Sequence, residues 1–362
     1  MAPGLIGDSA EPPEPKSELA QMVIAKISLG DHVSDIVASP NDPVAYVALP
    51  DSIAVIGGSV HDVSRIVPVS GHPRGLTMDA DGTRLYVSNY GDSVSEIDIA
   101  DYRVDVIPGA SFVQRVETVD GTLLYAAGNA IHGGHCGGRI SVIDAEEAKV
   151  AAIAGFDNYV ITGLAAAAEG NRVYAGLSLQ SAYRQYDSGL VGVIDTAANA
   201  LIHTIDLGAS PDTINVSPDG SMLYTTHYDH KLVSAVDLAS QSVTPIALSD
   251  GPLGVSITPD DLQVYVTNRC SLSVIDTVTN EVAPIAVGDL PRCVRISPDG
   301  KRAYVSNFGD GSVSVIDTIA QCVTDTVEVG GHPEALAVSP DGHHLYVGDY
   351  WSGTVTVLSV QP

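Results

Sequence analysis

The sequence is poor in residues of several kinds, and each scarcity argues against a class of protein. It contains 17 Lys and Arg against 44 Asp and Glu, which gives a net charge of 17 − 44 = −27. Nucleic-acid binding rests on a basic surface that neutralises phosphates, so this charge argues against a nucleic-acid partner. No apolar stretch approaches the roughly 18 residues of a membrane helix, and we therefore expect no membrane insertion. The acidity itself favours solubility.

Large aromatic residues and cysteine are also scarce. Three Phe and one Trp leave the core to Val, Ile, Leu and Ala, within a hydrophobic content of 45%. The 35 Gly and 21 Pro are spread along the chain, which is typical of many short strands joined by turns. Four cysteines are too few for a disulfide-dense scaffold. The composition predicts an all-β protein.

A short repeat runs through the chain. The signature SPDG stands at 217–220, 297–300 and 339–342, with degenerate copies at 39–42, 79–82, 118–121, 167–170 and 258–261. Four positions after the last residue of each of the eight copies comes a tyrosine, which we call the anchor tyrosine. The anchors are Tyr46, Tyr86, Tyr125, Tyr174, Tyr224, Tyr265, Tyr304 and Tyr346. Such a period is the signature of a repeat architecture.

Each repeat reads as four short antiparallel strands. An apolar strand precedes the Asp-Gly turn, in which Gly adopts positive φ, and three more strands follow. Such a sheet cannot bury both faces alone, whereas sheets stacked around an axis can. The sequence therefore predicts an all-β, eight-bladed β-propeller of four-stranded antiparallel blades, with the anchor tyrosines packed between blades. Seven blades, with residues 31–70 irregular, is the alternative.

The two ends of the chain predict how the ring closes. The last repeat ends at Val360 without a fourth strand, and residues 22–30 match the fourth-strand pattern without a repeat before them. We expect this N-terminal strand to complete the C-terminal blade. Residues 1–20, rich in Pro, Glu, Ser and Ala, are expected to be a disordered leader or linker without a signal-peptide pattern. Residues 21–362 are expected to form a single β-propeller domain.

The repeat resembles that of the YVTN β-propeller family, whose name-giving tetrapeptide stands unaltered at 265–268. The resemblance spans residues 22–360. It implies the propeller fold and favours a bacterial, extracytoplasmic protein, because members include surface-layer and periplasmic proteins and a few enzymes. Related propellers include sugar lactonases and a metal-dependent antibiotic lyase. No catalytic signature of those enzymes can be matched here residue by residue, so the resemblance implies no activity.

Two repeats are longer than the others. The anchor tyrosine and the Asp that ends the third strand are 12 residues apart in blade 2, but 19 apart in blade 3 and 21 in blade 4. Both insertions therefore fall between the second and third strands. These loops share one face of the disc with the connections between blades, and two long loops there form a natural wall for a site.

Histidines gather in the loops around these insertions, in blades 3 and 5. His132, His135, His227 and His230 form two His-x-x-His pairs, and imidazoles are ligands for Zn or Cu. A divalent metal is thus a candidate cofactor; the alternative is that these are polar residues of exposed loops with no specific role. We expect His135 and His227 to lie outside the blade core.

A second set of candidates would bind a small polar ligand. Some belong to the loops of blades 4 and 5, and others stand eight residues before the end of the SPDG signature, where the first strand of a blade begins. These candidates are Tyr183, Arg184, Tyr186, Tyr228, Arg74, Arg292, Asp212 and Glu334. The alternative for the strand-start positions is that they are ordinary turns of the repeat.

The repeat predicts on which face of the disc three cysteines lie and whether they can form a disulfide. Cys270 and Cys293 should lie on the same face of adjacent blades and are candidates for a disulfide, with two free thiols as the alternative. Cys322 precedes the last strand of blade 7 on the opposite face and is predicted to be a lone thiol.

The preferred function is a non-catalytic module that binds a small polar ligand or a protein partner through the loops of one face. It rests on the lack of a nucleophile–base motif, a phosphate loop or paired carboxylates in the sequence. The alternative is an enzyme, a lyase or hydrolase and a candidate for metal dependence, whose His-rich site lies at the channel mouth in blades 3–5. Histidine suits proton transfer near neutral pH. Whether the protein is an enzyme stays open at this point.

The charge generates a first prediction. Because a surface of net charge −27 repels phosphates, the protein should not retain duplex DNA at physiological salt. An electrophoretic mobility-shift titration measures this, and a micromolar complex would contradict it.

Overall fold

The computed structural model describes residues 22–57, 61–90, 93–108, 113–118, 123–132, 135–145, 147, 149–179 and 188–360. These residues form strands and turns, without an α-helix among them. In this part of the chain, accordingly, no helix is long and apolar enough to cross a membrane.

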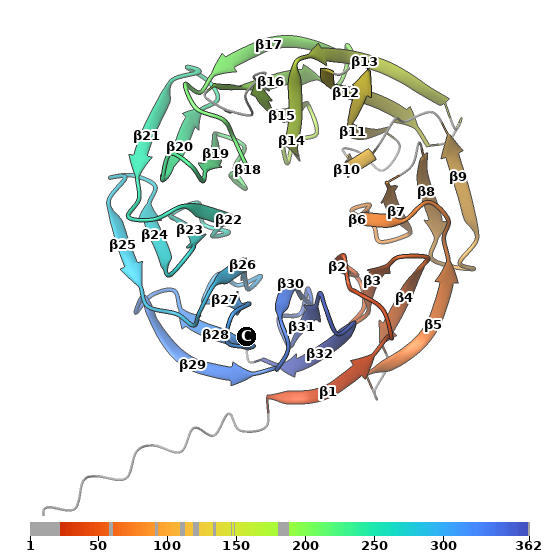
Figure 1. Ribbon diagram of the computed structural model, residues 1–362, viewed down its shortest axis with the longest axis vertical. Helices are drawn as coiled ribbons and strands as arrows, with labels where there is room; N and C mark the ends of the chain where they lie inside the picture. Colours follow the sequence, from red (N-terminus) through yellow and green to blue (C-terminus); the bar gives the residue numbers. More distant parts are fainter. Residues whose placement is uncertain are drawn as a thin grey trace, which may run out of the picture.

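The strands form eight four-stranded antiparallel sheets arranged as a ring (Figure 1). The predicted eight-bladed propeller is confirmed, and the seven-bladed alternative is wrong because residues 31–70 contain a complete blade. In each blade the first strand lies nearest the axis and the fourth lies at the rim (Figure 1).

Blades 1 and 2 contain β2 (Asp35–Ala38), β3 (Ala45–Leu49), β4 (Ser52–Gly57), β5 (Asp62–Pro68), β6 (Pro73–Met78), β7 (Arg84–Asn89), β8 (Ser93–Asp98) and β9 (Val104–Pro108). Blades 3 and 4 contain β10 (Val113–Thr118), β11 (Leu123–His132), β12 (His135–Asp144), β13 (Lys149–Asp157), β14 (Tyr159–Ala166), β15 (Arg172–Leu179), β16 (Gly189–Asp195) and β17 (Ala200–Asp206). Blades 5 and 6 contain β18 (Thr213–Val216), β19 (Met222–His227), β20 (Leu232–Asp237), β21 (Val243–Ala247), β22 (Pro252–Ile257), β23 (Gln263–Asn268), β24 (Leu272–Asp276) and β25 (Val282–Ile285). Blades 7 and 8 contain β26 (Pro291–Ile296), β27 (Arg302–Asn307), β28 (Ser312–Asp317), β29 (Cys322–Glu328), β30 (Pro333–Val338), β31 (His344–Asp349), β32 (Thr354–Ser359) and β1 (Val23–Ser28).

The SPDG signature is a self-satisfied turn. In blade 5 the Ser217 hydroxyl donates to Asp219 at 2.7 Å, and the Asp219 carboxylate accepts the N–H of Ser221 at 2.9 Å. Gly220 has φ +73°, a left-handed conformation that glycine adopts without steric cost. These hydrogen bonds hold the pKa of Asp219 below its usual range. The turn therefore joins the first two strands of a blade without leaving its polar groups unpaired.

The anchor tyrosines pack between blades, as predicted. All eight are buried. Tyr46 of blade 1 packs against Leu85 and Val87 of blade 2. Tyr346 of blade 8 lies in a cluster with Val47 of blade 1 and donates to a blade 1 backbone carbonyl at 3.0 Å. Each blade is thus held to the next by buried apolar surface, and removing one such large side chain typically costs about 3–5 kcal/mol.

The ring closes through the N-terminal strand, as predicted. β1 pairs antiparallel with β32, with Ile27 opposite Val355, and forms the outer edge of blade 8 (Figure 1). Ile27 and Met22 are buried in the clusters on either side of that blade. The Lys26 ammonium also donates to the Val329 carbonyl oxygen of blade 7 at 2.8 Å. The first strand therefore joins the end of the ring to its beginning.

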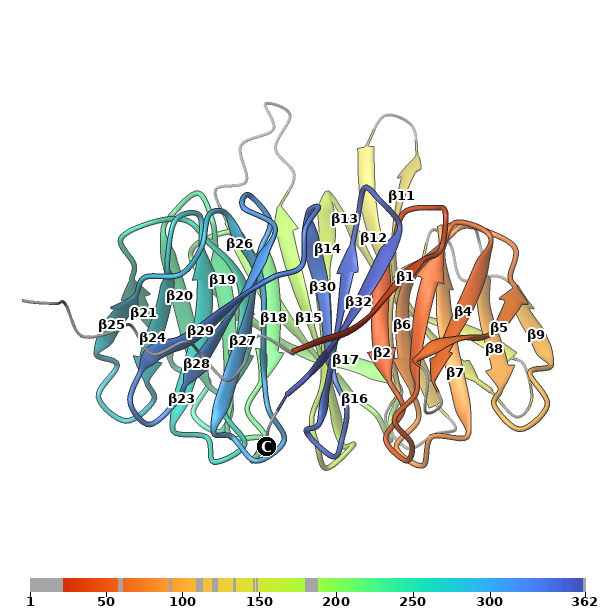
Figure 2. The ribbon, with the colours of Figure 1, turned by 90° about the horizontal axis from the view of Figure 1, so that it is seen from below.

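The connections between blades and the turns between second and third strands lie on one face, which we call the mouth face. Both insertions fall on it, between β11 and β12 and between β15 and β16, as predicted. In blade 3 the extra residues extend the two strands, which pair as far as His132 and His135 and project beyond the disc (Figure 2). The glycine-rich segment expected to be a loop is thus largely a β-ladder.

Cys270, Cys293 and Cys322 are free thiols. The disulfide hypothesis for the first two is therefore wrong. Cys270 is exposed in the turn after β23, whereas Cys293 lies half-buried within β26 with its sulfur 3.9 Å from the Val294 carbonyl oxygen. Cys322 is exposed at the first residue of β29, which agrees with the predicted lone thiol.

Closure by β1 can be tested by truncation. Deleting residues 1–30 removes the buried Met22 and Ile27 and exposes the edge of β32. Burial of two such side chains contributes about 3–6 kcal/mol, so the melting temperature should fall sharply. Deletion of residues 1–20 is the control and should leave it unchanged. Equal melting of the two truncations would contradict closure by this strand.

Candidate functional site

A cavity of about 590 Å³ opens on the mouth face over blades 5 to 8. Its wall includes the strand-start residues of four successive blades, Asp212, Leu253, Arg292 and Glu334. The turns between second and third strands add Tyr228, Asp229 and Arg269. Four of the predicted ligand-binding residues therefore line one cavity, because the repeat places equivalent positions of neighbouring blades side by side around the axis.

Two arginines of the mouth cavity lack the carboxylate partners that arginines elsewhere in the blades have. Two arginines at the start of second strands are neutralised: Arg84 lies 2.9 Å from Glu96, and Arg172 lies 2.7 Å from Asp195. Arg269 and Arg292 have no ion-pair partner within the described residues. The guanidinium carbon of Arg292 lies 5.1 Å from the centre of the Phe308 ring, a cation–π contact that orients the group and leaves its charge uncompensated.

Asp212 lines the same cavity as these arginines. Its carboxylate accepts the backbone N–H of Tyr228 at 2.5 Å, which ties blade 5's connection to its own turn. Loss of solvation within the recess raises the pKa of Asp212, and the Tyr228 hydrogen bond opposes that rise. The mouth cavity thus holds cationic and anionic groups that do not neutralise one another directly.

His230 lies in an adjoining cavity of about 150 Å³, whose wall shares Asp212 and Asp229 with the larger one. It is exposed, as expected of a loop residue. The two cavities are neighbours on the mouth face.

His227 occupies a different environment from the one expected. It is fully buried at the end of β19, and its Nδ1 lies 2.8 Å from the Ser210 carbonyl oxygen and its Nε2 lies 2.9 Å from the Ser234 hydroxyl. A carbonyl oxygen only accepts, so Nδ1 carries the proton and Nε2 accepts from Ser234. Both ring nitrogens are occupied, and the expectation that His227 lies outside the blade core is wrong.

The repeat explains this burial. His227 stands three residues after its anchor tyrosine, where blades 2, 6 and 7 have Asn89, Asn268 and Asn307. Each of these amides donates to a serine of the third strand at 2.9 Å, namely Ser95, Ser273 and Ser314. His227 contacts the corresponding Ser234 through a hydrogen bond of opposite direction, since its Nε2 accepts, and is therefore the blade 5 form of a structural position. Alignment of the repeats by their tyrosines is the sequence signal that identifies this role.

The other predicted site residues are distributed as follows. Arg74, on β6 in blade 2, stacks on Tyr90 at 5.3 Å and does not line the cavity over blades 5 to 8. The backbones of His132 and His135 pair across the β11–β12 hairpin. Tyr183, Arg184 and Tyr186 lie outside the described residues. Within the part of the chain that the structure describes, no three His, Cys, Asp or Glu side chains form a metal-binding group, and the metal site stays a prediction.

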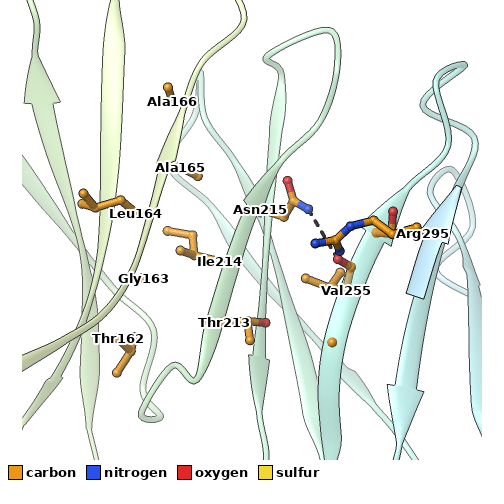
Figure 3. Close-up of a pocket in the computed structure, with 12 residues that line it drawn as sticks. Thr162, Gly163, Leu164, Ala165, Ala166, Thr213, Ile214, Asn215, Val255 and Arg295 are labelled. Carbon is orange, nitrogen blue, oxygen red and sulfur yellow. Dashed lines mark hydrogen bonds between the residues drawn. The ribbon is translucent and has the colours of Figure 1, made fainter. Parts of the chain in front are cut away.

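A deeper cavity of about 480 Å³ lies within the channel, along the inner strands of blades 4, 5 and 6. Thr213 and Gly254 line both this cavity and the mouth cavity, so the two cavities adjoin each other. Arg295 of β26 lines it as well, and Figure 3 shows its guanidinium directed toward Asn215 of β18. Arg295 was not among the residues predicted from the sequence, although it stands three residues after Arg292 on the same strand.

Comparisons with known proteins agree with this architecture. Residues 191–362 match the YNCE-like beta-propeller family. Among solved structures, hydrazine synthase of Kuenenia stuttgartiensis is similar, with a TM-score of 0.61 and 22% identity over 80% of this chain and 95% of that chain. At that identity the likeness concerns the fold alone. No curated protein matches the chain in sequence.

The protein is thus a β-propeller, defined by its ring of blades and by the match of its C-terminal residues. The β-propeller fold that the resemblance drawn from the sequence implies is confirmed. Because 1555 chains of solved structures resemble it, the fold selects no single function.

The buried histidine makes stability depend on pH. Burial lowers the pKa of His227 to about 4, although the bond to Ser210 opposes this. In the unfolded chain this histidine has a pKa of about 6.5. Below that pH the unfolded chain binds a proton at this histidine, whereas the folded chain does not. Its contribution to stability is therefore complete above that value and falls as the pH drops toward 4.

His227→Asn restores the residue of blades 2, 6 and 7 and removes this titration. Between pH 7 and pH 5 the native protein should lose about 2 kcal/mol more unfolding free energy than the variant. Urea unfolding of both proteins at the two pH values measures this difference in unfolding free energy. The contributions of the other titrating groups are the same in both proteins and cancel. Parallel losses in both proteins would show that His227 is not held neutral.

Proposed function

We propose that this propeller is a non-catalytic binding module that takes up a small polar ligand in the mouth cavity. The observation that carries the proposal is that two guanidinium groups without an ion-pair partner among the described residues, Arg269 and Arg292, line one cavity together with Asp212 and Glu334. A volume of about 590 Å³ lies within the range of ligand pockets, which is about 300–1,000 Å³.

The charges of the recess indicate the chemistry of the ligand. Guanidinium groups bind carboxylates through paired N–H donors. Asp212 and Glu334 accept hydrogen bonds, and ionised carboxylates favour cationic donors. A ligand that satisfies both sets carries an anionic group and an amino group close together, as an α-amino acid does. The ligand class we propose is therefore a small zwitterion.

Binding has better support than catalysis in the described residues. Cys293 lines the cavity, but its sulfur contacts only a backbone carbonyl oxygen and no histidine that would activate it. His227 uses both ring nitrogens within the blade. The alternative, a metal-dependent lyase or hydrolase built on His132, His135, His227 and His230, would have to break the His227 hydrogen bonds.

Arg292→Gln tests the proposal. Loss of a charge-assisted hydrogen bond costs about 1.5–3 kcal/mol, so affinity for an α-amino acid should fall by about 10- to 100-fold. Isothermal titration with norvaline, which has a neutral side chain, measures it. Arg103→Gln is the matched control, because that side chain is 63% exposed at the rim, pairs with Asp105 and should not affect binding.

Each contrary result is informative. Unchanged affinity in the Arg292 variant would place the ligand elsewhere. Binding of propylamine and butyrate as tightly as norvaline would contradict the requirement for a zwitterion.

A further inference from the structure

The deep cavity has a single charged group among its described lining residues, the guanidinium of Arg295. The walls that face it are built from small or neutral residues, including Gly163, Ala165 and Ser256. The cavity measures about 480 Å³, which is room for part of a ligand beyond the guanidinium. The inside of the channel here is thus cationic in a protein whose net charge is −27.

Arg295 is left with most of its hydrogen-bonding capacity. It is exposed to the channel, and its one recorded bond among the described residues runs from a terminal N–H to the Val294 carbonyl oxygen at 3.1 Å. A guanidinium has five N–H donors in a planar fork. Nearby, the Asn215 amide donates to the Val255 carbonyl oxygen at 3.4 Å, a long bond that a stronger acceptor can replace. Both groups are donors, and both suit an anion.

The deep cavity adjoins the mouth cavity, and a ligand that extends along the inner strands would reach from one to the other. Thr213 and Gly254 line each of them. Arg292, at the mouth, and Arg295, below it, stand three residues apart on β26, a rise of about 10 Å along a strand. The pairing of β26 is irregular between Pro291 and Val294, which breaks the strict alternation of side chains along the strand, and Arg292 lines the mouth cavity while Arg295 lines the deep cavity.

We infer that Arg295 forms a second anion subsite, and that the ligand is a zwitterion with an additional terminal anionic group that reaches down the channel. This rests on the proposed zwitterion site at the mouth and extends it to a ligand class, the acidic α-amino acids and their longer homologues. The α-amino and α-carboxylate groups of the ligand bind between Arg292 and Asp212. The terminal anionic group binds Arg295 and Asn215. A terminal carboxylate and a terminal phosphonate supply the same charge.

A series of ligands and one variant test the inference. Aspartate, glutamate, 2-aminoadipate and 2-aminopimelate, each against a neutral amino acid of similar size, are titrated into the native protein, Arg295→Gln and Arg103→Gln. At least one acidic member should bind about tenfold more tightly than its neutral counterpart. Arg295→Gln should abolish this gain and leave norvaline binding unchanged, whereas Arg103→Gln should retain it. An unchanged melting temperature confirms that each variant is folded.

The outcomes separate the two proposals. If norvaline binds but no acidic ligand gains affinity, or if the gain survives Arg295→Gln, the second subsite is wrong and the mouth site stands. If glutarate binds in an Arg295-dependent way while norvaline does not bind, the subsite stands and the zwitterion head is wrong. If no probe binds, both are overturned. Replacing glutamate by 2-amino-4-phosphonobutyrate shows whether the subsite prefers a carboxylate or a phosphonate.

Discussion

Burial of each blade against its two neighbours is the interaction on which the whole structure depends. A four-stranded sheet of Val, Ile, Leu and Ala has two apolar faces, and a closed ring covers both of them in every blade. The anchor tyrosines reinforce these contacts, since all eight are buried. A ring without free ends requires one more element, and β1 supplies it by pairing with β32. The channel and its mouth exist because this closure fixes the distance of every first strand from the axis.

The repeat separates positions that hold the fold from positions that are free to vary. Three residues after the anchor tyrosine, an Asn in several blades donates to a serine of the next strand, and His227 contacts the corresponding serine by accepting its hydroxyl hydrogen. Asp349 at the same position accepts the backbone N–H groups of His332, Trp351 and Ser352. The position at the start of the first strand, by contrast, varies between blades: it is Asp212 in blade 5, Arg292 in blade 7 and Glu334 in blade 8. Residues of different charge at this one repeat position give the mouth cavity both cationic and anionic groups. The structure of the blades does not change with them.

The distribution of charge follows the same division. Arg84 and Arg172, at the start of second strands, are paired with carboxylates, whereas Arg292 and Arg295 face the channel without such partners among the described residues. An acidic exterior favours solubility, and a few guanidiniums enclosed by the ring attract an anion at short range, where solvent screens them less. The protein therefore combines an acidic surface with cationic groups inside the channel.

The number of blades, the strand order and the closing strand were determined by the sequence alone, because an eightfold repetition of turn and tyrosine is a local, periodic signal. Arg292, Asp212 and Glu334 were also found from that period, since equivalent positions must lie around one axis. The burial of His227, the free thiols of Cys270 and Cys293, and the role of Arg295 were decided only by the tertiary structure. Each depends on which way a side chain points and what lies across the channel or the blade interface, and contacts between residues far apart in the chain determine both.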